Sequence, residues 1–148
     1  MLCRWSEKMN IKAIRDRLVE HGETLFHTPK QPLIEFTKAP KADALLNDIT
    51  HHPHAFVLAC VMDRQIKAET AWIIPYRISE KLSGFSMRTL ARLSRTDING
   101  LMSKPEPLHH FVNKMSDCFH SAIQRIKNQY AEDASQIWAG SPSSAEVV

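Results

Sequence analysis

The feature that most constrains the fold is a long stretch, residues 108–130, in which apolar side chains return every three or four positions. Polar side chains such as Asn113 and Lys114 fill the positions between them. The apolar members are Phe111, Met115, Cys118, Phe119, Ala122, Ile123 and Ile126. This period predicts one long amphipathic helix, which must bury its apolar face against other elements of the chain.

The first part of the chain predicts one helix and a connector. Apolar residues from Ile11 onward recur at helical spacing, and Gly22 is a typical residue for ending such a helix. Residues 27–43 contain three of the eight prolines and cannot form a continuous helix. We expect a connector on the surface, held down by Leu33, Ile34 and Phe36, and then a short helix over residues 41–49.

A buried helix is predicted after Pro53, a residue that is well tolerated in the first helical turn. The run HAFVLACVM is apolar all round, and we expect one of its faces to be formed by Phe56, Val57, Cys60 and Val61. The run AWIIPYRISEKL predicts a second helix, which Pro75 should kink or restart and Gly84 should end.

Three further helix starts are predicted from capping residues. Ser86 can cap a short helix over residues 87–93, and Ser94, with Thr96 and Asp97, can open another that ends at Ser103. After the long helix a last turn passes through Ile137 and Trp138, and Ser143 or Ser144 can cap a helix that begins near the end of the chain. We interpret this late cap as the start of a helix that the chain does not complete.

These patterns together predict an all-α, compact multi-helix domain of about seven helices. Residues 1–148 are expected to form a single domain, with a helix and connector in residues 1–40 and the remaining helices in residues 41–148. A hydrophobic fraction of 43% is enough for a core, and four glycines are few for a fold built on tight β-turns.

Charge and cysteine content set weak limits on function. The net charge of +3 is compatible with nucleic acid as a partner but does not argue for it. Cys3, Cys60 and Cys118 are scattered and form no CxxC pair. Cys60 and Cys118 lie among apolar residues of predicted helices and are interpreted as small buried hydrophobes. The chain has no apolar run long enough to span a bilayer and no signal-peptide core, so we expect a soluble, cytoplasmic protein without a membrane partner.

No pattern of catalytic residues is visible in the sequence. The chain contains no GxSxG, P-loop, GxGxxG or HExxH motif. The cluster of His51, His52 and His54 could bind zinc, but a role in the turn before the next helix is the favoured interpretation, so no metal site is predicted. His109 and His110 are interpreted as a polar flank of the long helix.

The segment MDRQIKAETAW is the most unusual part of the chain. It places Arg64, Gln65 and Lys67 at a polar break between two apolar helices. Two cations beside an amide can contact a phosphate backbone or a base edge, and the alternative interpretation is a solvated corner between helices.

The run HPHAFVLACVMDRQIKAETAW resembles the helix-hairpin-helix superfamily of DNA glycosylases, the endonuclease III-like group. Residues 82–102 and 109–133 are similar to later helices of that group, so the resemblance covers about residues 41–148. It implies that Gln65 probes the DNA stack and fills the gap left by a flipped base, with Arg64 and Lys67 as further DNA-binding residues. Ile66 departs from the small or polar residue that is common after this glutamine.

The resemblance stops before the catalytic part of such enzymes. Relatives continue into a glycine-rich hairpin, a lysine nucleophile, a catalytic aspartate and often four cysteines that hold a 4Fe-4S cluster. None of these is present, so no catalytic residue and no cofactor is assigned to this chain. The resemblance therefore predicts an incomplete base-excision repair glycosylase that binds DNA weakly, with a separately encoded C-terminal half or self-association as further possibilities. The alternatives are a non-catalytic helical protein-interaction module and, third, a metal-dependent enzyme that uses the histidines.

Overall fold

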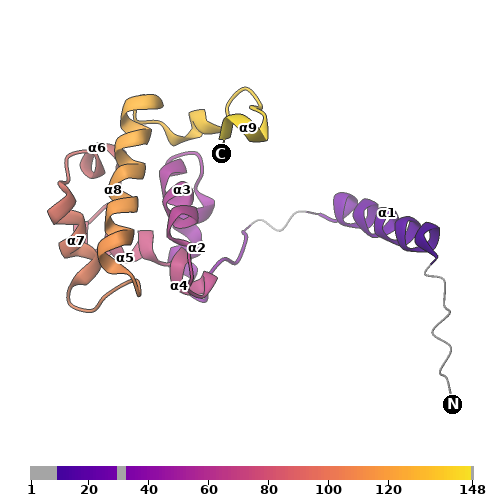
Figure 1. Cartoon of the computed structure of the whole chain (residues 1–148), viewed down its shortest axis with the longest axis horizontal. Helices are drawn as coiled ribbons and strands as arrows, with labels where there is room; N and C mark the ends of the chain where they lie inside the picture. Colours follow the sequence, from indigo (N-terminus) through magenta and orange to yellow (C-terminus); the bar gives the residue numbers. More distant parts are fainter. Residues whose placement is uncertain (1–9, 30–32, 148) are drawn as a thin grey trace, which may run out of the picture. The chain divides into compact units, whose positions relative to one another are not determined.

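The structure is a computed structural model that describes residues 10–29 and 33–147, with the side chains of residues 146 and 147 left out. Within these residues the chain forms helices and turns and no strand, which confirms the predicted all-α class (Figure 1). None of the helices in this part of the chain is long and apolar enough to cross a membrane. The chain divides into two compact units, residues 1–32 and residues 33–148.

The first unit contains the helix α1 (Ile11–His27). The side chain of Asn10 accepts a hydrogen bond from the Ala13 N–H and caps the helix start. The prediction that the helix ends at Gly22 is wrong, because the helix continues for five more residues. It ends where Thr28 adopts an extended conformation, as a residue before a proline prefers. A single glycine costs a helix only about 1 kcal/mol, so it does not have to end one.

No residue of α1 is buried. Its apolar side chains are exposed along the helix: Ile11, Ile14, Leu18, Val19, Leu25 and Phe26. The part of the predicted connector at residues 30–32 lies outside the described residues.

The second unit is a helical body whose elements surround one core. Its helices are α2 (Pro40–Asn47), α3 (Pro53–Met62), α4 (Ala68–Trp72), α5 (Ile74–Leu82), α6 (Met87–Leu90), α7 (Arg95–Ser103), α8 (Val112–Gln129), the 3₁₀ helix η1 (Ala134–Ile137) and α9 (Ser144–Val147). The long helix α8 lies between α7 and α3 and contacts both (Figure 1). The predicted periodic face is confirmed for Met115, Phe119, Ile123 and Ile126, all of them buried. The helix begins at Val112, four residues later than expected, and Phe111 just before it is exposed.

Polar bonds hold the segment before α2 against the body. One carboxylate oxygen of Asp43 accepts hydrogen bonds from the backbone N–H of Phe36 and from both the N–H and the hydroxyl of Thr37. The side-chain amide of Asn47 accepts a hydrogen bond from the Ile34 N–H and donates one to the Ile34 carbonyl. The prediction that Leu33 and Ile34 hold this segment down by apolar contact is therefore wrong, since both side chains are exposed. Phe36 does pack on the core, where its ring stacks on Trp72.

The helix α3 is the most deeply buried short helix, as its composition predicts. Its fully buried apolar face consists of Ala55, Leu58, Ala59 and Met62. The predicted face around Phe56 and Val57 is only partly buried, and Cys60 is exposed. A helix that is apolar all round gives no period by which its buried face can be chosen, so the choice depends on where α8 and α5 lie.

The predicted caps at Ser86 and Ser94 and the predicted role of Pro75 are confirmed. Ser86 accepts a hydrogen bond from the Thr89 N–H, and Ser94 forms a reciprocal capping box with Asp97 at the start of α7. Pro75 occupies the first turn of α5, so a new helix begins there and α4 does not continue through it.

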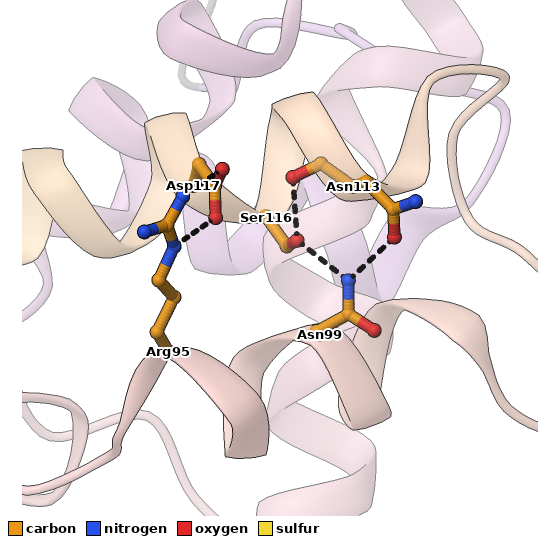
Figure 2. Close-up of polar contacts among 5 residues, drawn as sticks. All are labelled: Arg95, Asn99, Asn113, Ser116 and Asp117. Atoms are coloured by element: carbon orange, nitrogen blue, oxygen red, sulfur yellow. Dashed lines mark hydrogen bonds and ion pairs between the residues drawn. The ribbon is translucent and has the colours of Figure 1, made fainter.

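A polar seam joins α7 to α8 (Figure 2). The Asn99 amide donates hydrogen bonds of 3.0 Å to both the Asn113 side chain and the Ser116 hydroxyl. Ser116 is fully buried and donates in turn to the Asn113 carbonyl. Beside this cluster, Arg95 of α7 forms an exposed ion pair with Asp117 of α8. The seam fixes the pairing of two helices that are otherwise held together by apolar contacts.

Candidate nucleic-acid interface

A tight turn connects α3 to α4 at the segment that the sequence singles out. The helix α3 ends at Met62, whose carbonyl accepts a hydrogen bond of 2.8 Å from the Arg64 N–H. The Asp63 carboxylate accepts a hydrogen bond of 2.9 Å from the Trp72 indole, which ties the turn to the end of α4. This bond joins both sides of the turn, and Arg64, Gln65 and Lys67 lie exposed between them.

Gln65 lies at the reversal point of this turn. Its φ of 58° places it in the left-handed region, which costs a residue with a side chain about 1 kcal/mol or more. The side chain is exposed, whereas that of the next residue, Ile66, is partly buried against the core. The turn thus holds an amide side chain outward in a conformation that glycine or asparagine would adopt more easily.

An open pocket of about 600 Å³ lies beside Gln65. Its polar lining comes from Gln65, Lys67, Thr70, His109 and His110. Its apolar lining comes from Ile66, Pro107 and Leu108. The pocket therefore joins the α3–α4 turn to the segment that precedes α8, two stretches about forty residues apart in the sequence.

His109 is the buried member of the pocket lining. Only 3% of the residue is exposed, and its Nδ1 accepts a hydrogen bond of 3.0 Å from the Phe111 N–H. The neutral ring therefore carries its proton on Nε2. That nitrogen is buried and has no hydrogen-bond partner among the described residues. A buried donor without an acceptor costs about 1–3 kcal/mol. Among the described residues the same lack of a partner is found for the buried Nδ1 of His52, which lies outside this pocket.

Of the three histidines around the start of α3, His51 and His54 have hydrogen-bond partners, whereas the buried Nδ1 of His52 has none among the described residues. The His51 ring bonds the Asp48 carboxylate at 2.9 Å, and the His54 Nε2 donates to the Phe85 carbonyl at 2.5 Å. Burial lowers the pKa of His54, so this ring is held in its neutral form. In the described part of the chain, no three His, Cys, Asp or Glu side chains gather closely enough to hold a metal ion.

Cys60 and Cys118 are free thiols in the described part of the chain. Partial desolvation, together with the charge of Asp63, raises the pKa of Cys60 above its usual value. A raised pKa keeps the thiol protonated at neutral pH and so makes it a poor nucleophile.

A second open pocket, of about 470 Å³, lies between α5 and α7. The Lys81 ammonium at its edge donates hydrogen bonds to the carbonyls of Leu101 and Lys104, at the end of α7. Its charge therefore already stabilises the C-terminus of that helix, where cations are favoured. We interpret this contact as structural.

The structure brings two of the three predicted DNA-binding residues to one pocket. Gln65 and Lys67 both line it, while Arg64 lies on the exposed turn outside the lining. No pattern in the sequence predicts that His109 and His110 join them, because the spacing within either segment does not encode their proximity. Only the packing of α3 and α7 against α8 makes the two segments neighbours.

Comparisons of the chain with protein-family models, with characterised proteins and with solved structures find no match. The assignment of a function therefore depends on the site itself and on the resemblance described above.

Proposed function

We propose that this protein is a DNA-binding helical domain of the base-excision repair glycosylase type, which contacts DNA through the α3–α4 turn. The observation that carries the proposal is Gln65, held outward at a positive φ beside a pocket that also presents Lys67. The resemblance to endonuclease III-like glycosylases has its most specific part at this same turn. An amide side chain on a rigid turn can enter the gap that an extruded base leaves in a duplex.

Three neighbouring side chains have separate roles in this DNA contact. Gln65 contacts the bases, and the cations Arg64 and Lys67 contact the phosphate backbone on either side of it. Binding that relies on few cations is weak, and its affinity falls with salt by only about one power of the salt concentration for each cation in contact with a phosphate. We assign no catalytic residue and no cofactor, and we propose a cytoplasmic location, where free thiols such as Cys60 stay reduced.

Fluorescence anisotropy with a labelled duplex tests this proposal. The duplex is used intact and with one abasic site, at roughly 50 mM salt, where backbone contacts are strong. We expect Arg64→Ala to weaken binding to both duplexes, and Gln65→Ala to weaken mainly the binding to the abasic duplex. Arg125→Ala, an exposed change on α8, is the matched control. Binding that is indifferent to both turn variants, or absent at low salt, would contradict the proposal.

A second candidate function is protein–protein interaction through α1, and the six exposed apolar side chains of that helix favour it. We propose a second copy of the chain as the partner. With 100° between successive residues, Ile11, Ile14, Leu18 and Leu25 share one stripe of the helix. An antiparallel pair with Leu18 on the two-fold axis places Ile11 opposite the partner's Leu25.

A charge placed within the apolar stripe gives this candidate a specific test. We expect Leu18→Glu to abolish self-association, because it places two carboxylates together on the two-fold axis. Lys12→Glu, a change on the opposite face of the helix, is the control and should leave association as it is. Light scattering over a range of concentrations measures the mass. A monomer at all concentrations, or a Leu18→Glu protein that still associates, contradicts this pairing.

A further inference from the structure

The polar side chains of the pocket beside Gln65 share one chemical property. Each of them carries an N–H or O–H donor, and no carboxylate is among the described residues that line the pocket. Lys67 adds a full positive charge. Donors without acidic neighbours disfavour a cation and suit a group that has several acceptor oxygens and a negative charge.

The unpaired donor of His109 points to the same kind of ligand. The hydrogen bond from the Phe111 N–H occupies Nδ1 and so leaves a proton on Nε2, the buried nitrogen without a partner. A donor of this kind is stabilised only when an acceptor oxygen reaches it. Nε2 is closed to solvent. An acceptor oxygen of a ligand can therefore reach it only if neighbouring side chains of residues 107–110 shift.

We propose that the pocket is a phosphate-binding site, in which the His109 Nε2–H and the Lys67 ammonium donate to the oxygens of one phosphate group. A compact ammonium and a neutral imidazole together supply a charge and a directed donor, the combination that a phosphate oxygen accepts. The phosphate chemistry follows from the pocket alone. That the phosphate belongs to a DNA backbone, and not to a free phosphate, rests on the proposed function.

Nuclear magnetic resonance of the ¹⁵N-labelled full chain reports directly on His109. A long-range ¹H–¹⁵N spectrum identifies the ring nitrogens, and Nε2 should appear protonated in the free protein. We expect the Nε2 signal to move on titration with inorganic phosphate and on titration with a short DNA duplex. Lys67→Gln should weaken phosphate binding about tenfold, since it removes a charged donor. Lys41→Gln, an exposed change in α2, should leave it unchanged.

Salt dependence separates the two sources of phosphate. For a DNA duplex, Lys67→Gln should reduce the slope of log affinity against log salt by about one. If inorganic phosphate moves the His109 signal but no duplex binds, the phosphate site stands and the proposed function fails. If a duplex binds with an unchanged slope in Lys67→Gln and an unmoved His109 signal, the phosphate site is overturned while the proposed function stands. A His109 signal that neither ligand moves also overturns it.

Discussion

His54 links the start of α3 to the loop before α6 by a single buried hydrogen bond, from its Nε2 to the Phe85 carbonyl. Burial is the largest influence on this ring and lowers its pKa, while the bond to Phe85 acts in the opposite direction. In the unfolded chain His54 therefore binds a proton near pH 6.5, whereas in the folded protein it binds one only at lower pH. The contribution of the neutral His54 ring to stability is fully present above pH 6.5. It is lost as the pH falls from 6.5 toward the lower pKa of this ring in the folded state.

The replacement His54→Gln should flatten this pH dependence. We expect the free energy of unfolding to fall less between about pH 7.5 and about pH 5.5 in the variant than in the native protein. The measurement is urea unfolding at the two pH values. His21→Gln, an exposed change in α1, is the control and should leave the difference as it is. An undiminished pH dependence in His54→Gln would show that another group causes it.

Gln65 allows stability and binding to be separated at one position. Glycine adopts the positive φ of this turn without strain but loses more entropy on folding, and the two effects nearly offset. Gln65→Gly should therefore change the free energy of unfolding by no more than about 1 kcal/mol. The same change removes the amide, so binding to an abasic duplex should weaken as much as in Gln65→Ala. A destabilised Gln65→Gly protein would mean that the side chain stabilises the turn itself.

At the scale of elements, the polar seam between α7 and α8 contains a cluster around Ser116 and a separate ion pair (Figure 2). Ser116 is buried, whereas the ion pair is exposed. Asn99→Ala removes the donor to the buried Ser116 hydroxyl and should lower the free energy of unfolding by about 1–2 kcal/mol. Asp117→Asn breaks only the solvent-exposed pair with Arg95 and should have a much smaller effect. Urea unfolding of both variants measures the difference. Equal losses would contradict the dominance of the buried part.

Elements with a local cause were predictable from the sequence. Ser86 and the pair Ser94 and Asp97 fix helix starts through bonds three residues apart, and Pro75 marks a restart for steric reasons. The end of α1 was not predictable from Gly22, because the propensity of one residue competes with the rest of the helix. The exposure of Cys60 was not predictable either, since an all-apolar helix does not specify which side faces the core.

The candidate site was predictable only in its α3–α4 half. The polar break placed Gln65 and Lys67 together because they are two residues apart, and the sequence shows this directly. The contribution of His109 depends on the packing of helices distant in sequence, and its unpaired nitrogen depends on a local bond to Phe111. Neither the packing nor that bond leaves a periodic signal in the sequence.

At the scale of the whole molecule, the proposed DNA contact and the proposed self-association belong to different units. The turn at Gln65 and its pocket lie in the body of residues 33–148, and the apolar stripe lies on α1 in residues 1–32. Two functions on separate units can be removed one at a time. Leu18→Glu should abolish association and leave the affinity for a duplex unchanged, apart from any gain that two linked sites provide.

The same division predicts that the body folds without α1. Among the residues that the structure describes, the buried apolar ones of the core all lie in residues 42–134, and α1 contributes none. A chain that begins at Leu33 should therefore unfold in one cooperative transition, with a free energy of unfolding within about 1 kcal/mol of the full chain. Urea unfolding followed by circular dichroism measures this, and it should be done at low concentration, where association through α1 adds no stability. The helical signal should fall by the share that α1 contributes, with the midpoint unchanged. A body that loses cooperativity without residues 1–32 would show that α1 is part of its core.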